Sequence, residues 1–267
     1  DYLRGKSGAS TATAKVEEAK VAAEAEPPAG PAIQRSVLIE APARPCGLAM
    51  AGLLGARKIL VTDDGGGIAQ EVVRALASRG LSAEVASAVT GEPDVLLFLG
   101  GLRAVASIDE AVAVNHEAFR AAQAVAARFA ARFGVLVTVQ DTGGDFGLSG
   151  RDLTRAYLAG VSALARTAAV EWPSASVKAV DLERGDRSPA ALADALVEEL
   201  FTGGAAREVG LHADGRRTTL RSVPREIGPA STSLPLNDVD AGPISRGTLR
   251  RVVRSVPREI GPASTSF

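Results

Sequence analysis

A glycine-rich turn is the first feature of this 267-residue chain whose residue types suggest chemistry. Its residues are Thr62, Asp63, Asp64, Gly65, Gly66 and Gly67. Such a turn between a strand and a helix can bind a pyrophosphate, because small residues let the backbone approach and the helix start offers free N–H groups. Here two carboxylates stand where the phosphates would lie, and their repulsion opposes a dinucleotide. In the alternative interpretation, the glycines only allow the helix to pack closely on a sheet.

Acidic residues also follow other apolar segments. Asp141 and Asp145 lie, like Asp63 and Asp64, at expected carboxyl ends of strands, where doubly wound folds place their sites. A metal-binding or hydrolytic cluster would require these oxygen atoms to converge. The sequence does not show such convergence, so we expect no metal site.

Histidine and cysteine are scarce in the chain. His116 and His212 are the only histidines and Cys46 is the only cysteine, too few for a convincing zinc site. His116 lies among helix alanines and is interpreted as a surface or packing residue. Cys46 has no base beside it, which argues against a nucleophile.

Alternating strand and helix patterns position these residues. Continuous apolar runs indicate buried strands, and apolar residues at helical spacing indicate helices. The expected strands are 36–40, 59–62, 82–85, 94–99, 135–139 and 177–182, and the expected helices are 68–80, 108–133, 153–171 and 190–201. This alternation predicts an α/β protein with a doubly wound, Rossmann-like parallel sheet. Residues 208–211 and 218–221 flank a turn at Ala213-Asp214-Gly215 and predict a terminal hairpin.

Composition argues against several classes of protein. The near balance of 30 basic and 31 acidic residues gives no field that would attract nucleic acid or an anionic membrane. No apolar run reaches the roughly 18 residues of a membrane helix, and one cysteine cannot form an intrachain disulfide. The first residues are neither a signal peptide nor an initiator methionine. We therefore expect a piece of a larger cytoplasmic polypeptide.

The chain divides into three expected segments. Residues 1–34 are rich in Ala, Glu, Lys, Thr and Pro and are predicted to be a flexible interdomain linker. Residues 35–223 form the α/β domain, and residues 224–267 form a tail containing Pro and Gly. The segment from Arg221 to Ser233 recurs letter for letter from Arg254 to Ser266. Two copies are too few for a solenoid, and we expect residues 234–267 to be weakly ordered.

Two phrases carry a resemblance to a known family. Residues 137–148, Val-Thr-Val-Gln-Asp-Thr-Gly-Gly-Asp-Phe-Gly-Leu, and residues 165–173, Ala-Arg-Thr-Ala-Ala-Val-Glu-Trp-Pro, are its most specific elements. They resemble the short-chain dehydrogenase/reductase fold, and residues 36 to 223 are similar to the ketoreductase region of type I polyketide synthases and polyunsaturated fatty acid synthases. In that family the region has a structural half and a catalytic half. Only the catalytic half binds NADPH and reduces the β-keto group.

Departures from the reductase pattern indicate which half this is. Such reductases use a tyrosine as proton donor, a lysine or asparagine four residues later, and a serine that holds the substrate carbonyl. Counted back from residue 171, these positions fall on Thr154, Leu158 and Asp141. Threonine cannot act as an acid near neutral pH, and leucine cannot bind a ribose. Asn115 is the only residue of the pattern that is retained, and one residue cannot run the reaction. All four positions, Asn115, Asp141, Thr154 and Leu158, are therefore interpreted as vestigial.

The resemblance implies a degenerate short-chain reductase fold and a non-catalytic structural subdomain. It implies no cofactor for this domain, with NADPH bound by the catalytic half that reduces β-ketoacyl thioesters. The implied partners are that catalytic half, neighbouring synthase domains and an acyl carrier protein, with no nucleic acid and no membrane. Two alternatives stay open: an NADP-dependent β-ketoacyl reductase with an atypical active site, and an acyl-carrier interaction module. The candidate basic residues for the latter are Arg216, Arg217, Arg221 and Arg225.

Overall fold

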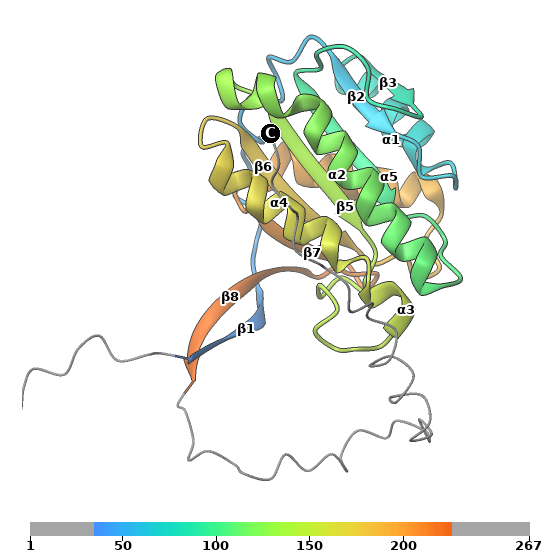
Figure 1. Cartoon of the computed structure of the whole chain (residues 1–267), viewed down its shortest axis with the longest axis vertical. Helices are drawn as coiled ribbons and strands as arrows, with labels where there is room; N and C mark the ends of the chain where they lie inside the picture. Colours follow the sequence, from blue (N-terminus) through green and yellow to red (C-terminus); the bar gives the residue numbers. More distant parts are fainter. Residues whose placement is uncertain (1–34, 226–267) are drawn as a thin grey trace, which may run out of the picture. The chain divides into compact units, whose positions relative to one another are not determined.

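An eight-stranded sheet with the strand order β1-β8-β7-β6-β5-β4-β2-β3 forms the centre of the molecule (Figure 1). The computed structural model describes residues 35–225. Strands β3, β2, β4, β5, β6 and β7 run parallel, and β8 runs antiparallel to β7. The strands are β1 (Arg35–Pro42), β2 (Ile59–Thr62), β3 (Ala83–Ala86), β4 (Val95–Gly101), β5 (Val135–Gln140), β6 (Ser176–Leu182), β7 (Glu208–Leu211) and β8 (Arg217–Arg225). The predicted doubly wound α/β fold is confirmed.

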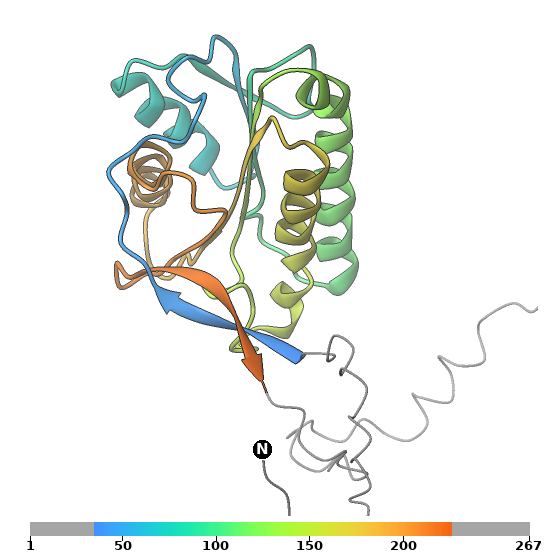
Figure 2. The same cartoon turned by 90° about the vertical axis from the view of Figure 1, so that its left-hand side faces the viewer.

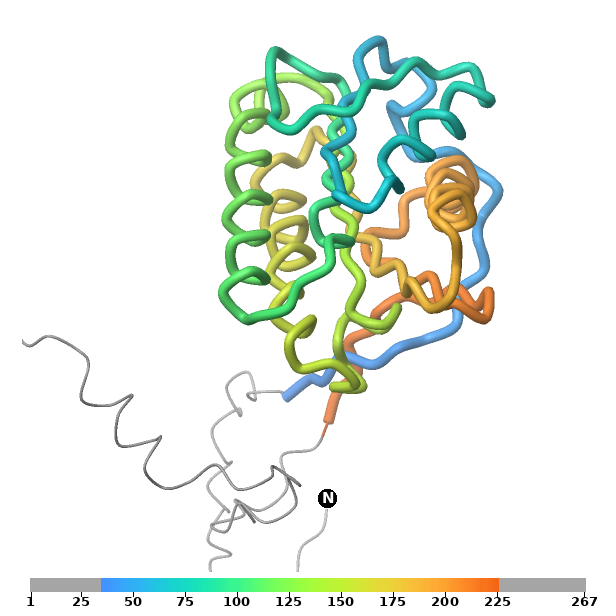
Figure 3. The backbone as a smooth tube through the Cα atoms, turned by 90° about the vertical axis from the view of Figure 1, so that its right-hand side faces the viewer, coloured from blue at the N-terminus to red at the C-terminus, as the bar shows by residue number. Residues whose placement is uncertain are grey.

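Helices cover both faces of the sheet. Helices α1 (Ile68–Ser78) and α5 (Pro189–Thr202) lie on one face, and α2 (Ile108–Ala131) and α4 (Ala159–Glu171) lie on the other (Figures 2 and 3). The central strands are therefore buried on both sides, which explains why β2, β4 and β5 are continuous apolar runs. No helix among residues 35–225 is long and apolar enough to cross a membrane.

The helix expected over residues 153–171 is instead two helices, so this prediction was wrong. Helix α3 (Leu153–Ala156) is one short turn, and α4 begins at Ala159. Between them the Leu158 amide bonds to the Arg155 carbonyl three residues back, at 2.8 Å, which is a tight 3₁₀ pattern. The Asn115 side chain fixes this junction, because its Nδ2 donates to the Tyr157 carbonyl at 2.8 Å.

Strands β1 and β8 form a two-stranded ribbon that extends beyond the rest of the sheet (Figures 1 and 2). Leu38 and Ile39 of β1 are 38% and 42% exposed. Strand β8 continues through Pro224 to Arg225, so it contains the start of the first repeat copy. The predicted linker 1–34, the remainder of that copy and the second copy lie outside the described residues.

Candidate functional site

The glycine-rich turn binds one of its own carboxylates. Asp64 is only 1% exposed, and its two oxygens accept from the backbone amides of Gly66 at 2.9 Å and Ala69 at 2.8 Å. Gly67, directly before α1, has a φ of 87°, a left-handed conformation that favours glycine. The Asp64 carboxylate thus satisfies amides at the positive end of the helix dipole. The amides of Gly66 and Ala69 therefore already have an acceptor within the chain.

Replacing Asp64 with alanine is expected to lower the free energy of unfolding by about 2 kcal/mol, because two amides at the helix start lose their acceptor. The matched control is Asp63→Ala, since Asp63 lies on the same turn and accepts only from the Gly65 amide, at 3.2 Å. We expect the control to cost less than about 0.5 kcal/mol. Urea unfolding of both variants measures the difference, and equal losses would contradict the role given to Asp64.

Three of the positions predicted to be vestigial have different surroundings in the structure. Leu158 is fully buried in the apolar core that includes residues of α2 and α4, and Thr154 lies half-buried on α3. Asn115 donates to the carbonyls of Ala111, at 3.2 Å, and Tyr157, which is a structural role. Thr154 instead borders a surface hollow together with Ile108 and Tyr157.

Arg155 fills the space at the carboxyl ends of β4 and β5. Its guanidinium donates to the carbonyls of Asp141 at 2.6 Å, Gly101 at 3.2 Å and Arg103 at 3.3 Å. It also lies 3.6 Å from the Asp141 carboxylate, at the position expected for the serine. This residue was missed in the sequence, although a cation directly after Thr154 was a visible signal. These hydrogen bonds link α3 to the carboxyl ends of β4 and β5.

Asp181, at the end of β6, anchors the segment between β5 and α3. It is fully buried and accepts from the Thr142 amide and hydroxyl, both at 2.7 Å, and from the Phe146 amide at 2.5 Å. Burial raises the pKa of Asp181 to about 6. The sequence offered no signal for this role, because the carboxylate and its donors are more than thirty residues apart.

The raised pKa of Asp181 predicts a pH dependence of stability. Because the folded state binds this proton more tightly than the unfolded chain, the contribution is full below pH 4 and is lost as pH rises through 6. We expect the free energy of unfolding to rise by about 1 kcal/mol from pH 7 to pH 5. The full contribution of the Asp181 proton, reached below pH 4, is about 3 kcal/mol. Urea titrations at both pH values test this, and Asp181→Asn should remove the difference. If the stability of Asp181→Asn still differed between the two pH values, another titrating group would have to cause the difference.

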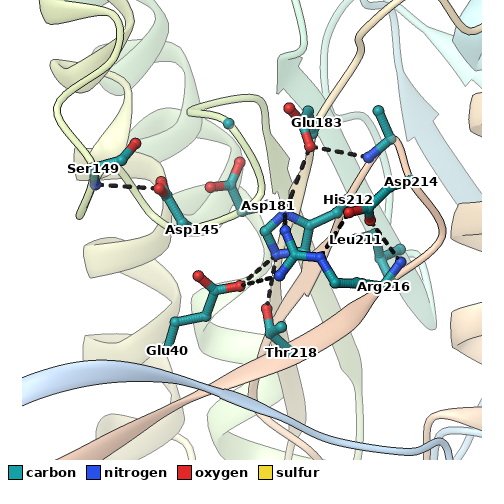
Figure 4. A network of polar contacts seen from close by, with 12 residues as sticks. Glu40, Asp145, Ser149, Asp181, Glu183, Leu211, His212, Asp214, Arg216 and Thr218 are labelled. Carbon is teal, nitrogen blue, oxygen red and sulfur yellow. Dashed lines mark hydrogen bonds and ion pairs between the residues drawn. The ribbon is translucent and has the colours of Figure 1, made fainter.

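His212 joins three parts of the domain (Figure 4). The imidazole is 2% exposed, with Nε2 lying 2.6 Å from Glu40 Oε1 on β1 and 3.1 Å from Thr218 Oγ1 on β8. Its Nδ1 lies 3.5 Å from Glu183 Oε2, just after β6. These contacts tie the β1–β8 ribbon to the sheet. His212 is therefore a buried structural residue, and the sequence did not indicate this.

Asp145, another acidic candidate, accepts hydrogen bonds from the backbone of its own loop. Asp145 accepts from the Gly147 amide at 2.9 Å and from the Ser149 amide at 3.1 Å, which is drawn in Figure 4. Within residues 35–225, no group of three or more His, Cys, Asp or Glu side chains is arranged to hold a metal ion. The acidic residues at the strand ends each accept a hydrogen bond from a backbone amide; they are Asp63, Asp64, Asp141 and Asp145.

Comparison with known proteins gives information on the fold. No family model and no curated protein matches the chain. Among solved structures, it is similar to a multidomain structure of the adenylation, ketoreductase and pseudo Asub domains of a keto acid-selecting NRPS module. The TM-score is 0.52 at 13% identity, and the match covers 72% of this chain and 18% of that one. The chain has a Rossmann-like fold.

Two further structures match over parts of the chain. One is the bulky-bulky ketone specific alcohol dehydrogenase from Comamonas testosteroni, with a TM-score of 0.41, 21% identity, and coverage of 53% of this chain and 81% of that chain. The other is a ketoreductase domain from the bacillaene assembly line, with a TM-score of 0.40, 13% identity, and coverage of 73% and 38%. At these identities the likeness concerns the fold alone, and any activity must be argued from the site.

Proposed function

We propose that residues 36–225 form the non-catalytic structural half of a ketoreductase region in a polyketide or polyunsaturated fatty acid synthase. The observation that carries this proposal is the buried Asp64 carboxylate, which takes the place of a cofactor phosphate at the start of α1. The burial of Leu158 adds to it, because no polar group at this position can contact a ribose. The fold shared with a ketoreductase-containing structure agrees with the proposal.

In this proposal the domain supports a catalytic half that binds NADPH and reduces β-ketoacyl thioesters. The β1–β8 ribbon is the element best suited to that contact. Strand β1 is the last strand of the sheet, and an edge strand with exposed apolar side chains, here Leu38 and Ile39, favours pairing with another polypeptide segment. Neighbouring synthase domains and an acyl carrier protein are further partners of the same proposal.

Titration with NADPH tests the absence of a cofactor site directly. A hollow of about 400 Å³ lies beside the turn and is bordered by Thr62, Asp63 and Phe98, so the space near the turn is not closed. We expect no binding heat in calorimetry, no shift in melting, and no reduction of a β-ketoacyl thioester surrogate. A real site at a hundred times its Kd would add about 2.7 kcal/mol to stability. A catalytically active short-chain reductase serves as positive control, and micromolar NADPH binding would overturn the proposal.

A second experiment tests the supporting role. In a synthase polypeptide that carries this domain, Leu38→Asp with Ile39→Asp should reduce ketoreductase turnover. The same changes should leave the melting temperature of the isolated domain within a degree or two, because both side chains are already partly exposed. Unchanged turnover would show that the ribbon does not support the catalytic half.

A further inference from the structure

An exposed apolar surface lies at the amino-terminal end of the sheet, opposite the glycine-rich turn, which follows the carboxyl end of β2. Its largest side chains are Leu48, in the segment between β1 and β2, and Phe133, between α2 and β5. Leu48 is 66% exposed and Phe133 is 49% exposed. Exposed apolar side chains that gather on one surface mark a contact with a partner.

A hollow of about 240 Å³ lies in this surface, and we call it the amino-end hollow. Its walls come from segments that precede β2, β5, β6 and β7, which are far apart in the sequence. Most of the lining is apolar. The lining residues with exposed side chains are Ala51, Phe133, Pro173, Ser174, Ala205 and Arg207.

Contacts within the domain fix the shape of the amino-end hollow. The Phe133 ring packs on Gly52, whose φ of 82° is a left-handed conformation that favours glycine. A β-carbon on Gly52 would collide with this ring. Leu48 is held through its backbone, because its carbonyl accepts from the Gly204 amide, on the wall of the hollow, at 2.8 Å. A preformed surface of this kind requires little ordering of the chain when a partner binds.

The rim of the amino-end hollow is basic. Arg207 lies on the rim, and Arg132 directly precedes Phe133; both are exposed. Within the part of the chain that the structure describes, neither guanidinium forms an ion pair. One exposed carboxylate, Glu171 at the end of α4, lies close in sequence to the Pro173 wall. The two free cations therefore outnumber the acidic groups that face them.

Buried charges beneath the surface have the same sign. Lys178 belongs to the lining of the amino-end hollow, and its ammonium group donates to Glu199 at 2.5 Å. The Arg217 guanidinium contacts the same carboxylate at 2.6 Å. Two cations thus share one carboxylate, which leaves an excess of positive charge below the hollow. Apolar walls with positive charge around and below them are complementary to an apolar side chain flanked by carboxylates.

The shape of the surface favours a protein partner over other anionic partners. A hollow admits one inserted side chain, whereas a bilayer surface is flat on this scale. Nucleic acid binds through a row of phosphate contacts, and two free arginines are too few for such a row. An amphipathic helix places apolar anchors on one face and charged residues beside them, as this surface requires.

We propose that the amino-end hollow binds an acidic amphipathic helix of a protein partner. An apolar side chain of that helix enters the hollow beside Phe133, and carboxylates on either side of it pair with Arg132 and Arg207. This surface includes neither the glycine-rich turn nor the β1–β8 ribbon, so the inference does not depend on the proposed function.

A labelled synthetic peptide tests the proposal by fluorescence anisotropy with the full chain. The peptide is a helix with leucine on one face and glutamate on the other, and we expect saturable binding at micromolar concentrations. Phe133→Ser should weaken this binding about ten-fold. The matched control is Leu153→Ser, because Leu153 is 77% exposed on α3, at the other end of the sheet, and should bind as the wild type does.

Two results of this titration would overturn the proposal: no binding by the wild-type chain, or equal binding by wild type and Phe133→Ser. Melting curves show whether Phe133→Ser is folded. If it is not, Leu48→Ser repeats the test, since the Leu48 side chain is largely exposed and its backbone makes the contacts with the domain.

Charge reversal tests the basic rim. Arg207→Glu should weaken binding of the glutamate peptide several-fold and allow binding of a matched peptide with lysine in place of glutamate. The control is Arg221→Glu, which changes an exposed arginine on β8 and should alter neither affinity. An unchanged affinity in Arg207→Glu would refute the charge pairing. Sedimentation with phosphatidylglycerol vesicles completes the test: binding to the vesicles without binding to the peptide would overturn the proposal in favour of a membrane surface.

Discussion

Replacing Glu199 with alanine is expected to lower the free energy of unfolding by about 4 kcal/mol. Glu199 on α5 is 3% exposed and accepts from Lys178 Nζ, on β6, at 2.5 Å. It also accepts from the Arg217 guanidinium, on β8, at 2.6 Å and 3.0 Å. Lys178 is itself 1% exposed, and burial lowers its pKa although Glu199 opposes this effect. Without the carboxylate, a buried ammonium group is left with no opposite charge.

The controls separate the buried triad of Glu199, Lys178 and Arg217 from an ordinary surface ion pair. Glu198→Ala removes the neighbouring carboxylate, which pairs with Arg79 at 2.6 Å on the surface, and should cost less than about 1 kcal/mol. Combining Lys178→Met with Glu199→Gln should cost less than Glu199→Ala alone, because the unpaired buried charge is removed. Urea unfolding measures all three variants. A mild loss in Glu199→Ala would show that solvent reaches Lys178.

The triad also illustrates what could be predicted from the sequence. Strand β6 was predicted from its apolar residues, but Lys178 in the middle of this strand gave no sign of its partner. Glu199 lies 21 residues later on α5, and Arg217 lies on a strand that pairs with β7. Local patterns report which face of an element is apolar. They do not report which two polar groups the tertiary fold brings together.

In the candidate site, too, the sequence predicted the residue types but not their contacts. Two carboxylates in the glycine-rich turn were visible in the sequence, and they were expected to repel phosphate. That Asp64 is buried and bonded to the amides of Gly66 and Ala69 depends on the turn geometry, which the residue types do not determine. Likewise, the pattern over residues 153–171 predicted a single uninterrupted helix, which was wrong. Its interruption depends on Asn115, whose place on another helix is not encoded locally.

Replacing Leu158 with lysine, the residue that resembling reductases keep at this position, is expected to lower the free energy of unfolding by about 4 kcal/mol. Leu158 is 0% exposed and belongs to the core cluster that contains Phe98, Val161 and Ala165. An ammonium group there would lose its hydration, and that core cluster consists of apolar residues. A lysine at position 158 would therefore destabilise the fold.

Leu158→Met is the matched control, since it keeps the volume and the apolar character and should cost less than about 1.5 kcal/mol. Thr154→Tyr is a second control, because Thr154 is only half-buried on α3 and a larger side chain there can extend toward solvent. Urea unfolding compares the three variants at neutral pH. If Leu158→Lys were as stable as the methionine variant, position 158 would have to face solvent or an open cleft. A ribose could then reach position 158, and only Asp64 at the glycine-rich turn would oppose NADPH.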